Sequence, residues 1–427
     1  MSSFDKIIGY EKEKEELLLI SDTLKNENKY KDFGVSIPKA LLIYGEAGLG
    51  KTLMANVLIE ESKRKCFCCK KDKPNGDLVN SIKETFEQAQ KFQPSIVFLD
   101  DMDKFAQDNL GQNNEEEFVT IQSCLESVKN DSVFVIATAN DIKNMPPSLL
   151  RAGRFGRQMQ IKNPSYEDTI KIVSHFFKDK KISSDVNIET ITNVLGSNTC
   201  AVLESITNEA GMYASYKNQD VITQNDIIKA TLRIATKEIE TNNYADKESK
   251  EILAYHEVGH AITALIFNKK VGYISIKQHG DNLGVCSESV QIDKIFSLKD
   301  IQNDIIELLG GKACVELFLK KFDTGAVNDI EKSTKMLRDC IEKMASSGFK
   351  YINDLNKYDE RHSPQRNDKI ANNISKQLKL LYNKAKKLLK KNKDKVFILV
   401  KNLLEKETLA YDEINYLTSN FYIRIEK

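Results

Sequence analysis

Three sequence patterns predict an α/β module with a parallel sheet and helices on both faces, followed by a mainly α-helical domain with a small β element. A glycine-rich loop at residues 45–52 stands between an apolar strand and a helix. Short, continuously apolar strands alternate with helices as far as residue 165, which is typical of a parallel sheet covered on both faces. A His-Glu-Val-Gly-His segment, residues 256–260, lies in a proline-free helical run.

Length and composition limit the classes of protein to consider. The 427 residues suffice for two or three domains. The net charge of +1 provides no basic field for a nucleic-acid partner. No apolar run approaches the ~18 residues that span a bilayer, so we expect no membrane insertion by this chain. Eight scattered cysteines and no export signal favour a soluble cytoplasmic protein, and a mature organellar fragment is the alternative.

The glycine-rich loop is a complete Walker A motif, G-x-x-x-x-G-K-T. It follows the predicted strand 41–44 and precedes a helix, as a phosphate-binding loop requires. Its backbone N–H groups would surround the phosphates of ATP, its lysine would reach the β- and γ-phosphates, and its threonine would bind Mg²⁺. The motif residues are Gly45, Glu46, Ala47, Gly48, Leu49, Gly50, Lys51 and Thr52.

Two further strands end in polar residues that suit ATP hydrolysis. The strand 95–99 ends at Asp100-Asp101, the form of a Walker B segment. Asp100 would hold Mg²⁺, and Asp101 would orient the attacking water. The strand 132–137 leads to Asn140, which can contact the γ-phosphate or the water. The carboxyl ends of parallel strands meet at one edge, so we expect these groups to lie beside the P-loop.

The His-Glu-x-x-His segment predicts a metal centre. His256 and His260, at i and i+4, share a helix face, so both imidazoles can reach one zinc ion. Glu257 can take a proton from the attacking water. The alternative is an ordinary helix that carries two histidines. A catalytic zinc site needs a third protein ligand and one open position.

The remaining pattern divides the chain into three predicted domains, at residues 1–165, 166–245 and 246–427. Helices are expected at 169–178, 203–216 and 224–234, and the polar stretch 241–246 is the expected boundary. Beyond the metal helix, the pattern predicts a strand at residues 273–277 and a turn at residues 280–282. Residues 283–287 could then pair back with that strand. Residues 301–309 read as a helix, and 367–405 as an amphipathic one. Cys66, Cys68 and Cys69 read as a strand rather than a metal or redox site, because alternate side chains point to opposite faces.

The order of these features resembles the AAA+ module and peptidase domain of FtsH-type zinc metalloproteases. The resemblance runs from residue 4 to about residue 415, and includes residues 4–17, 36–42, 85–89 and 150–157. It implies that Ile8 and Gly9 lie near the adenine and that Asn140 is the sensor. It also implies that Arg154 and Arg157 are arginine fingers acting on a neighbour.

The resemblance also implies the third zinc ligand and the assembly. The segment 323–330 resembles the family's Thr-Gly-Ala-x-x-Asp, so Asp329 would complete the ligand set of His256 and His260. The implied protein is an ATP-dependent zinc endopeptidase that unfolds, translocates and degrades polypeptides. The implied partners are unfolded or tagged substrates and further copies in a homo-hexamer.

Two departures leave alternatives open. Asp101 stands where the family has glutamate, one methylene longer, so hydrolysis could be slow. The segment 70–76 stands at the family's first pore loop without an aromatic residue. One alternative is therefore a peptidase subunit with weak ATP hydrolysis, acting in a mixed ring with a homologue. Another is a non-proteolytic AAA+ remodelling ATPase or chaperone, against which the intact metal motif argues.

Overall fold

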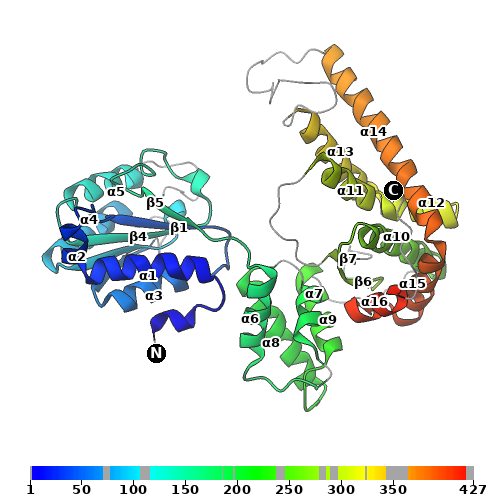
Figure 1. The fold of residues 1–427 in the computed structure, drawn as a ribbon, viewed down its shortest axis with the longest axis horizontal. Coiled ribbons are helices and arrows are strands. Elements are labelled where there is room, and N and C mark those ends of the chain that lie inside the picture. The colour runs from blue at the N-terminus through cyan, green and yellow to red at the C-terminus, as the bar shows by residue number, and fades with distance from the viewer. Residues whose placement is uncertain are drawn as a thin grey trace. The chain divides into compact units, whose positions relative to one another are not determined.

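The computed structural model describes residues 2–70, 77–105, 116–184, 186–195, 198–236, 246–277, 285–288, 297–322, 325–342 and 364–419. The chain forms two compact units, drawn in Figure 1. The first comprises Met1–Lys178 with Asn198–Ser205, and the second Asp179–Ser197 with Ile206–Lys427. The three-domain division made from the sequence stays a prediction. Most of its boundary segment 241–246, the segment 71–76 of the expected pore loop and the turn 280–282 lie outside the described residues.

A five-stranded parallel sheet of order β2-β3-β4-β1-β5 is the centre of the first unit. Its strands are β1 (Ala40–Tyr44), β2 (Lys65–Cys69), β3 (Ser95–Leu99), β4 (Val133–Ala139) and β5 (Arg157–Gln160). The three strands expected from apolar runs are present as β1, β3 and β4, and the strand expected at the three clustered cysteines is β2. The fifth, β5, was not expected, because only Met159 of its four residues is buried.

Helices cover both faces of this sheet, as the alternating pattern predicts. Helices α1 and α3 lie on one face and α4 and α5 on the other (Figure 1). The helices are α1 (Glu11–Lys25), α2 (Glu27–Asp32), α3 (Lys51–Ser62), α4 (Leu78–Lys91), α5 (Glu116–Ser127) and α6 (Tyr166–Phe177), with 3₁₀ turns η1 (Ser3–Lys6), η2 (Met102–Lys104) and η3 (Ile142–Asn144). Side chains on successive residues of β1, β3 and β4 alternate between the two covered faces, which is why every residue of these strands except Tyr44 is buried.

The second unit is mainly helical. Its helices are α7 (Ile188–Leu195), α8 (Cys200–Tyr216), α9 (Gln224–Thr236), α10 (Lys247–Ile266), α11 (Leu298–Leu308), α12 (Gly310–Phe318), α13 (Val327–Glu342), α14 (Pro364–Lys391), α15 (Lys393–Lys406) and α16 (Tyr411–Ser419); α8 begins in the first unit. The apolar faces of α10 to α15 share one core with β6. Helix α10 is therefore a central element, enclosed by its neighbours.

A small antiparallel sheet completes the second unit, in the order β7-β6-β8. Its strands are β6 (Val271–Ser275), β7 (Val285–Glu288) and β8 (Thr408–Ala410). The pairing of β6 with the strand that follows it is as expected. The single helix expected at 367–405 is instead two helices, α14 and α15; α15 ends at Lys406 because Glu407 adopts φ 60°, and β8 follows.

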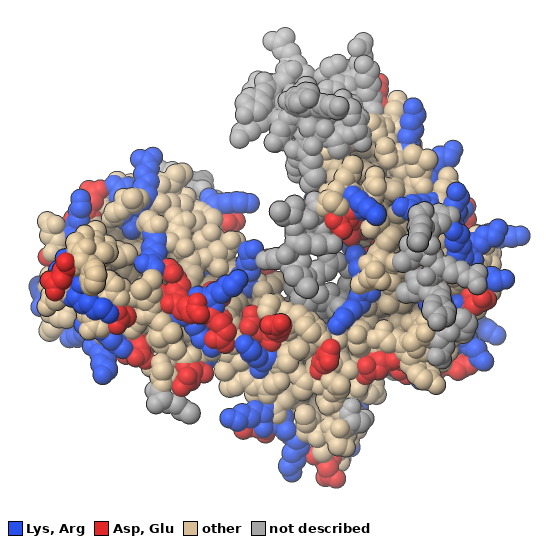
Figure 2. Space-filling view, viewed as in Figure 1, with Lys and Arg blue, Asp and Glu red and all other residues tan. Residues whose placement is uncertain are grey.

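Basic and acidic side chains are interspersed on the visible face of each unit (Figure 2), in agreement with the net charge of +1. Among the described residues, no helix combines the length and apolar character needed to cross a membrane.

Candidate functional site

The phosphate-binding loop has the backbone that its glycines permit. Gly48 and Gly50 have φ of 82° and 87°, in the left-handed region, and Gly50 precedes the first residue of α3. A side chain at Gly45 would bring its Cβ within 2.1 Å of the Ile161 carbonyl oxygen. The loop therefore directs the N-terminal N–H groups of α3 toward the edge of the sheet where β1 ends, and such an end attracts anions.

A chain of hydrogen bonds connects the P-loop lysine with the two neighbouring strands. Lys51 Nζ donates to the Glu46 carbonyl oxygen at 2.7 Å and to Asn140 Oδ1 at 2.9 Å. Asn140 Nδ2 in turn donates to Asp101 Oδ1 at 3.4 Å. Burial lowers the pKa of Lys51, and the carboxylates of Asp101, Asp103 and Asp100 partly offset that effect. The structure thus brings together Lys51, Asn140 and Asp101, as the strand-end argument predicts.

The pair of groups predicted to hold Mg²⁺ also lies together. Thr52 Oγ1 donates to Asp100 Oδ1 at 3.0 Å. Thr138 Oγ1 donates to the same oxygen at 2.7 Å and accepts the Asp101 N–H at 2.8 Å. The sequence argument missed Thr138, although a polar residue at the end of an apolar strand is a detectable signal. Hydroxyl and carboxylate oxygens are the ligands that Mg²⁺ prefers.

The N-terminal segment is fixed to the start of α6. Gly9 has φ 70°, and a Cβ there would lie 2.8 Å from Asp168 Oδ1. The Tyr10 N–H donates to that oxygen at 3.2 Å, and the Tyr10 hydroxyl donates to the Lys162 carbonyl oxygen at 3.0 Å. These contacts hold the backbone at Ile8 and Gly9 in place. The proposed position of these two residues near the adenine stays a prediction.

The two candidate arginine fingers have partners within the chain. Arg154 Nη1 donates to the Ser148 carbonyl oxygen at 2.6 Å and Arg154 Nη2 pairs with Glu126. Arg157 Nε donates to Glu16 Oε1 at 2.7 Å. Arg157 pairs with Leu41 in the sheet, whereas the P-loop follows Tyr44 at the other end of β1. Arg157 therefore lies away from the phosphate end of its own sheet, and both fingers stay predictions about a neighbouring copy.

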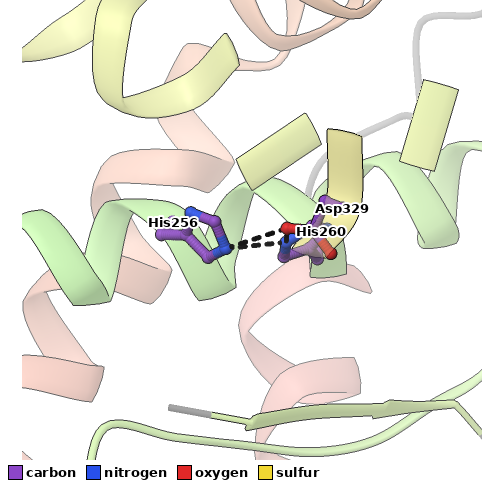
Figure 3. A group of neighbouring side chains, drawn as sticks. All are labelled: His256, His260 and Asp329. Carbon is purple, nitrogen blue, oxygen red and sulfur yellow. Dashed lines mark hydrogen bonds and ion pairs between the residues drawn. The ribbon is translucent and has the colours of Figure 1, made fainter. Parts of the chain in front are cut away.

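The metal-ligand candidates converge on one point, although Asp329 comes from a different helix (Figure 3). His256 and His260 lie on α10, and Asp329 lies in the first turn of α13. Asp329 Oδ2 lies 3.4 Å from His256 Nε2 and 3.3 Å from His260 Nε2, and the two Nε2 atoms are 3.0 Å apart. Among the described residues, these three form a cluster that could hold a metal ion.

The spacing of these donor atoms fits zinc. Zn–N and Zn–O bonds of about 2.0–2.2 Å in a tetrahedron place neighbouring ligand atoms about 3.3 Å apart. His260 Nδ1 lies 2.8 Å from the Glu307 carbonyl oxygen and can donate to it, so Nε2 is the ring nitrogen placed to bind a metal ion once it has lost its own proton. Burial alone would raise the pKa of Asp329, but hydrogen bonds from the two histidines hold it well below its usual range. The carboxylate is thus ionised, as a zinc ligand must be.

Glycines allow α12 to lie directly against the histidines. A Cβ at Gly259 would lie 2.4 Å from the Gly310 carbonyl oxygen, so α10 and α12 cross at close range. A Cβ at Gly311 would lie 2.5 Å from His260 Nε2 and 2.7 Å from His256 Cε1. Gly310 and Gly311 directly follow the helix expected at 301–309, and sequence reasoning gave them no part in the site. They form one wall of the metal centre, and the sequence signal for it is the glycine pair itself.

Glu257 is adjacent to the first histidine and is buried, with 6% of its surface exposed. Helix α10 also packs against β6 and β7. Among the described strands, β7 pairs with β6 on one side only, so it is an edge of the three-stranded sheet. A buried carboxylate and a strand edge thus accompany the three ligands in one unit.

Comparisons with known proteins agree with both sites. Residues 41–163 match the model of the ATPase family associated with various cellular activities (AAA), and residues 243–417 match peptidase family M41. The ATP-dependent zinc metalloprotease FtsH of Caldicellulosiruptor bescii is 30% identical over 97% of this chain and 72% of the relative. FtsH 2 of Thermoanaerobacter sp. is 29% identical over 97% of this chain and 82% of the relative. FtsH of Bacillus subtilis is 27% identical over 97% of this chain and 69% of the relative.

The similarity to these relatives covers both the P-loop unit and the metal helix. Together with the strand-end residues and the His256, His260 and Asp329 cluster, it shows that the chain belongs to the FtsH family of ATP-dependent zinc metalloproteases.

Proposed function

We propose that this chain is a zinc endopeptidase that uses ATP to unfold polypeptides and feed them to its peptidase sites within a ring of subunits. The observation that supports it most is the cluster of two imidazoles and one carboxylate, in a chain that also carries a complete P-loop. Three protein ligands leave one tetrahedral position for water or substrate, which is the pattern of a catalytic rather than a structural zinc site.

The side chains of the peptidase centre have separable tasks. His256, His260 and Asp329 would hold Zn²⁺, which when bound polarises the scissile carbonyl and makes water a better nucleophile. Glu257 would accept the proton of the attacking water and pass it to the departing amine. The side of β7 that faces away from β6, an edge among the described strands, would align the substrate by backbone pairing, so that cleavage depends little on the substrate's side chains.

The nucleotide site would supply the work of unfolding. Lys51 would bind the β- and γ-phosphates, Thr52 and Asp100 would hold Mg²⁺, and Asp101 with Asn140 would orient the water. Arg154 and Arg157 would act on the ATP of a neighbouring copy, which favours a homo-hexamer. A mixed ring with a homologue is the second arrangement, and the short Asp101 side chain favours it if this subunit hydrolyses ATP slowly. The scattered cysteines favour the cytoplasm as the compartment.

Degradation of casein by the purified chain tests this proposal. Cleavage should need ATP and should stop when a zinc chelator is added. The Glu257→Gln variant should retain zinc and ATP turnover but lose cleavage. Glu251→Gln, the same substitution elsewhere on α10, should behave like the unmodified chain.

Two results would decide against the proposal. Cleavage that survives Glu257→Gln would exclude the zinc mechanism. ATP-dependent unfolding of a fluorescent substrate, with no peptide bond broken by a zinc-loaded sample, would instead identify a remodelling ATPase.

A further inference from the structure

The turn that follows β3 presents Asp101 and Lys104 on the same side. Met102 and Phe105 are fully buried and anchor the turn in the core of the first unit. Asp101 caps η2 with φ 54° and ψ 47°, and the Lys104 N–H donates to the Asp101 carbonyl oxygen at 2.9 Å. Residues three apart eclipse one another in a 3₁₀ turn. The backbone of this turn therefore places the side chains of Asp101 and Lys104 next to each other.

The Asp101 carboxylate is held from both sides. Its Oδ1 accepts from Asn140 Nδ2 at 3.4 Å, on the side that leads to Lys51. Its Oδ2 accepts from Lys104 Nζ at 2.7 Å. Lys104 thus ends a chain of four side chains that runs from the P-loop lysine through the sensor asparagine and the Walker B acid. The oxygen that Lys104 does not contact, Oδ1, is the one on the side of Asn140, which itself accepts from the P-loop lysine.

The charges around this carboxylate give the lysine a second effect. Asp100, Asp101 and Asp103 all act on Lys51, so three carboxylates gather where ATP would add further negative charge. Contact with Asp101 raises the pKa of Lys104, which therefore stays protonated. Its ammonium group offsets part of the repulsion between the Asp101 carboxylate and a γ-phosphate. Because both side chains are partly exposed, the pair contributes to orientation more than to stability.

We propose that Lys104 is a positioning residue for ATP hydrolysis: it fixes the short Asp101 carboxylate with one oxygen directed at the attacking water. This inference rests on the proposed role of Asp101. In the step concerned, the water oxygen bonds to the γ-phosphorus as the bond to the bridging oxygen breaks. ADP leaves with that electron pair, and the proton of the water ends on the released phosphate. A carboxylate held in one orientation lowers the entropic cost of reaching the reactive geometry.

Steady-state ATP turnover by the purified full chain tests the proposal, with kcat and KM measured separately. Lys104→Gln should lower kcat about fivefold, the scale of an exposed ion pair, and leave KM for ATP unchanged. Lys104→Arg should keep most of the activity, because it keeps the charge. In an Asp101→Asn background, Lys104→Gln should have no further effect, since no carboxylate remains to be oriented.

The control is Lys143→Gln. Lys143 lies on the corresponding 3₁₀ turn η3 after β4 and forms no ion pair with any described residue. Its kcat should not change. Three results would overturn the inference about Lys104: unchanged or higher kcat in Lys104→Gln, a rise in KM instead of a fall in kcat, or equal losses in the presence and absence of the Asp101 carboxylate. If Asp101→Asn itself leaves ATP turnover unchanged, the proposed role of Asp101 fails as well. This single variant therefore separates a failure of the proposal for Lys104 from a failure of the proposal for Asp101.

Discussion

Replacing Gly311 by alanine should damage the metal centre while sparing the nucleotide site. The added Cβ would lie 2.5 Å from His260 Nε2, whereas ordinary contacts begin at 3.4 Å. The imidazole must therefore move by about 0.9 Å, several times the ~0.2 Å tolerance of a zinc–ligand bond. Because the atoms in the way belong to side chains that can rotate, we expect the fold to survive and the ligand geometry to change.

Zinc affinity is the quantity to measure for this variant. Disturbing the surroundings of a zinc ligand typically costs 10- to 100-fold in affinity, and we expect a loss of about that size in Gly311→Ala. Competition with a chromophoric chelator measures it, and peptide cleavage should fall in parallel while ATP turnover does not. Gly211→Ala is the matched control, since its Cβ would lie 3.6 Å from Ile222 Cδ1, an ordinary van der Waals contact. Wild-type zinc affinity in Gly311→Ala would refute the described packing of α12 against the histidines.

Three further changes probe other parts of the molecule. Asp101→Glu should raise the kcat of ATP turnover if reach limits hydrolysis, and a lower kcat would show that this site is built around the shorter acid. Asp329→Asn removes an anionic ligand and should weaken zinc binding by at least about 100-fold; an unchanged zinc dissociation constant would mean that another residue completes the set. Asp226 is fully buried and accepts from Lys217 at 2.6 Å and from the Thr223 N–H at 3.0 Å. Burial alone would raise the pKa of Asp226, but these bonds hold it below its usual value. The stability that they provide is therefore present above about pH 4 and is lost as the pH falls through the lowered pKa. Asp226→Asn should destabilise the protein by about 1–3 kcal/mol at pH 7, and the difference in thermal unfolding should shrink near pH 3; a difference that is independent of pH would contradict this.

The sequence predicted those features that short-range patterns encode. Three strands of the first sheet, β1, β3 and β4, follow from continuous apolar runs, because both faces of that sheet are covered. The approach of Lys51, Asn140 and Asp101 follows from the common edge at which parallel strands end. His256 and His260 follow from helical periodicity. In each case the spacing along the chain determines the arrangement in space.

Features that depend on distant contacts could not be read in the same way. Asp329 lies far along the chain from His260, and only the family resemblance singled it out. The short strands β5 and β8 lack an apolar run, and they exist because a neighbouring strand offers hydrogen bonds. The wall formed by Gly311 and the ion pair between Asp101 and Lys104 depend on which residues the fold places opposite one another.

The position of β8 determines when the metal half can mature during synthesis. Strand β6, which directly follows the metal helix, pairs with residues 408–410, and α10 packs against α15. A ribosome must therefore deliver nearly 150 further residues after His260 before the enclosure of the zinc ligands is complete. The sheet of the first unit needs no chain beyond β5. A nascent chain therefore completes the sheet of its nucleotide-binding unit early and the core around its metal ligands last.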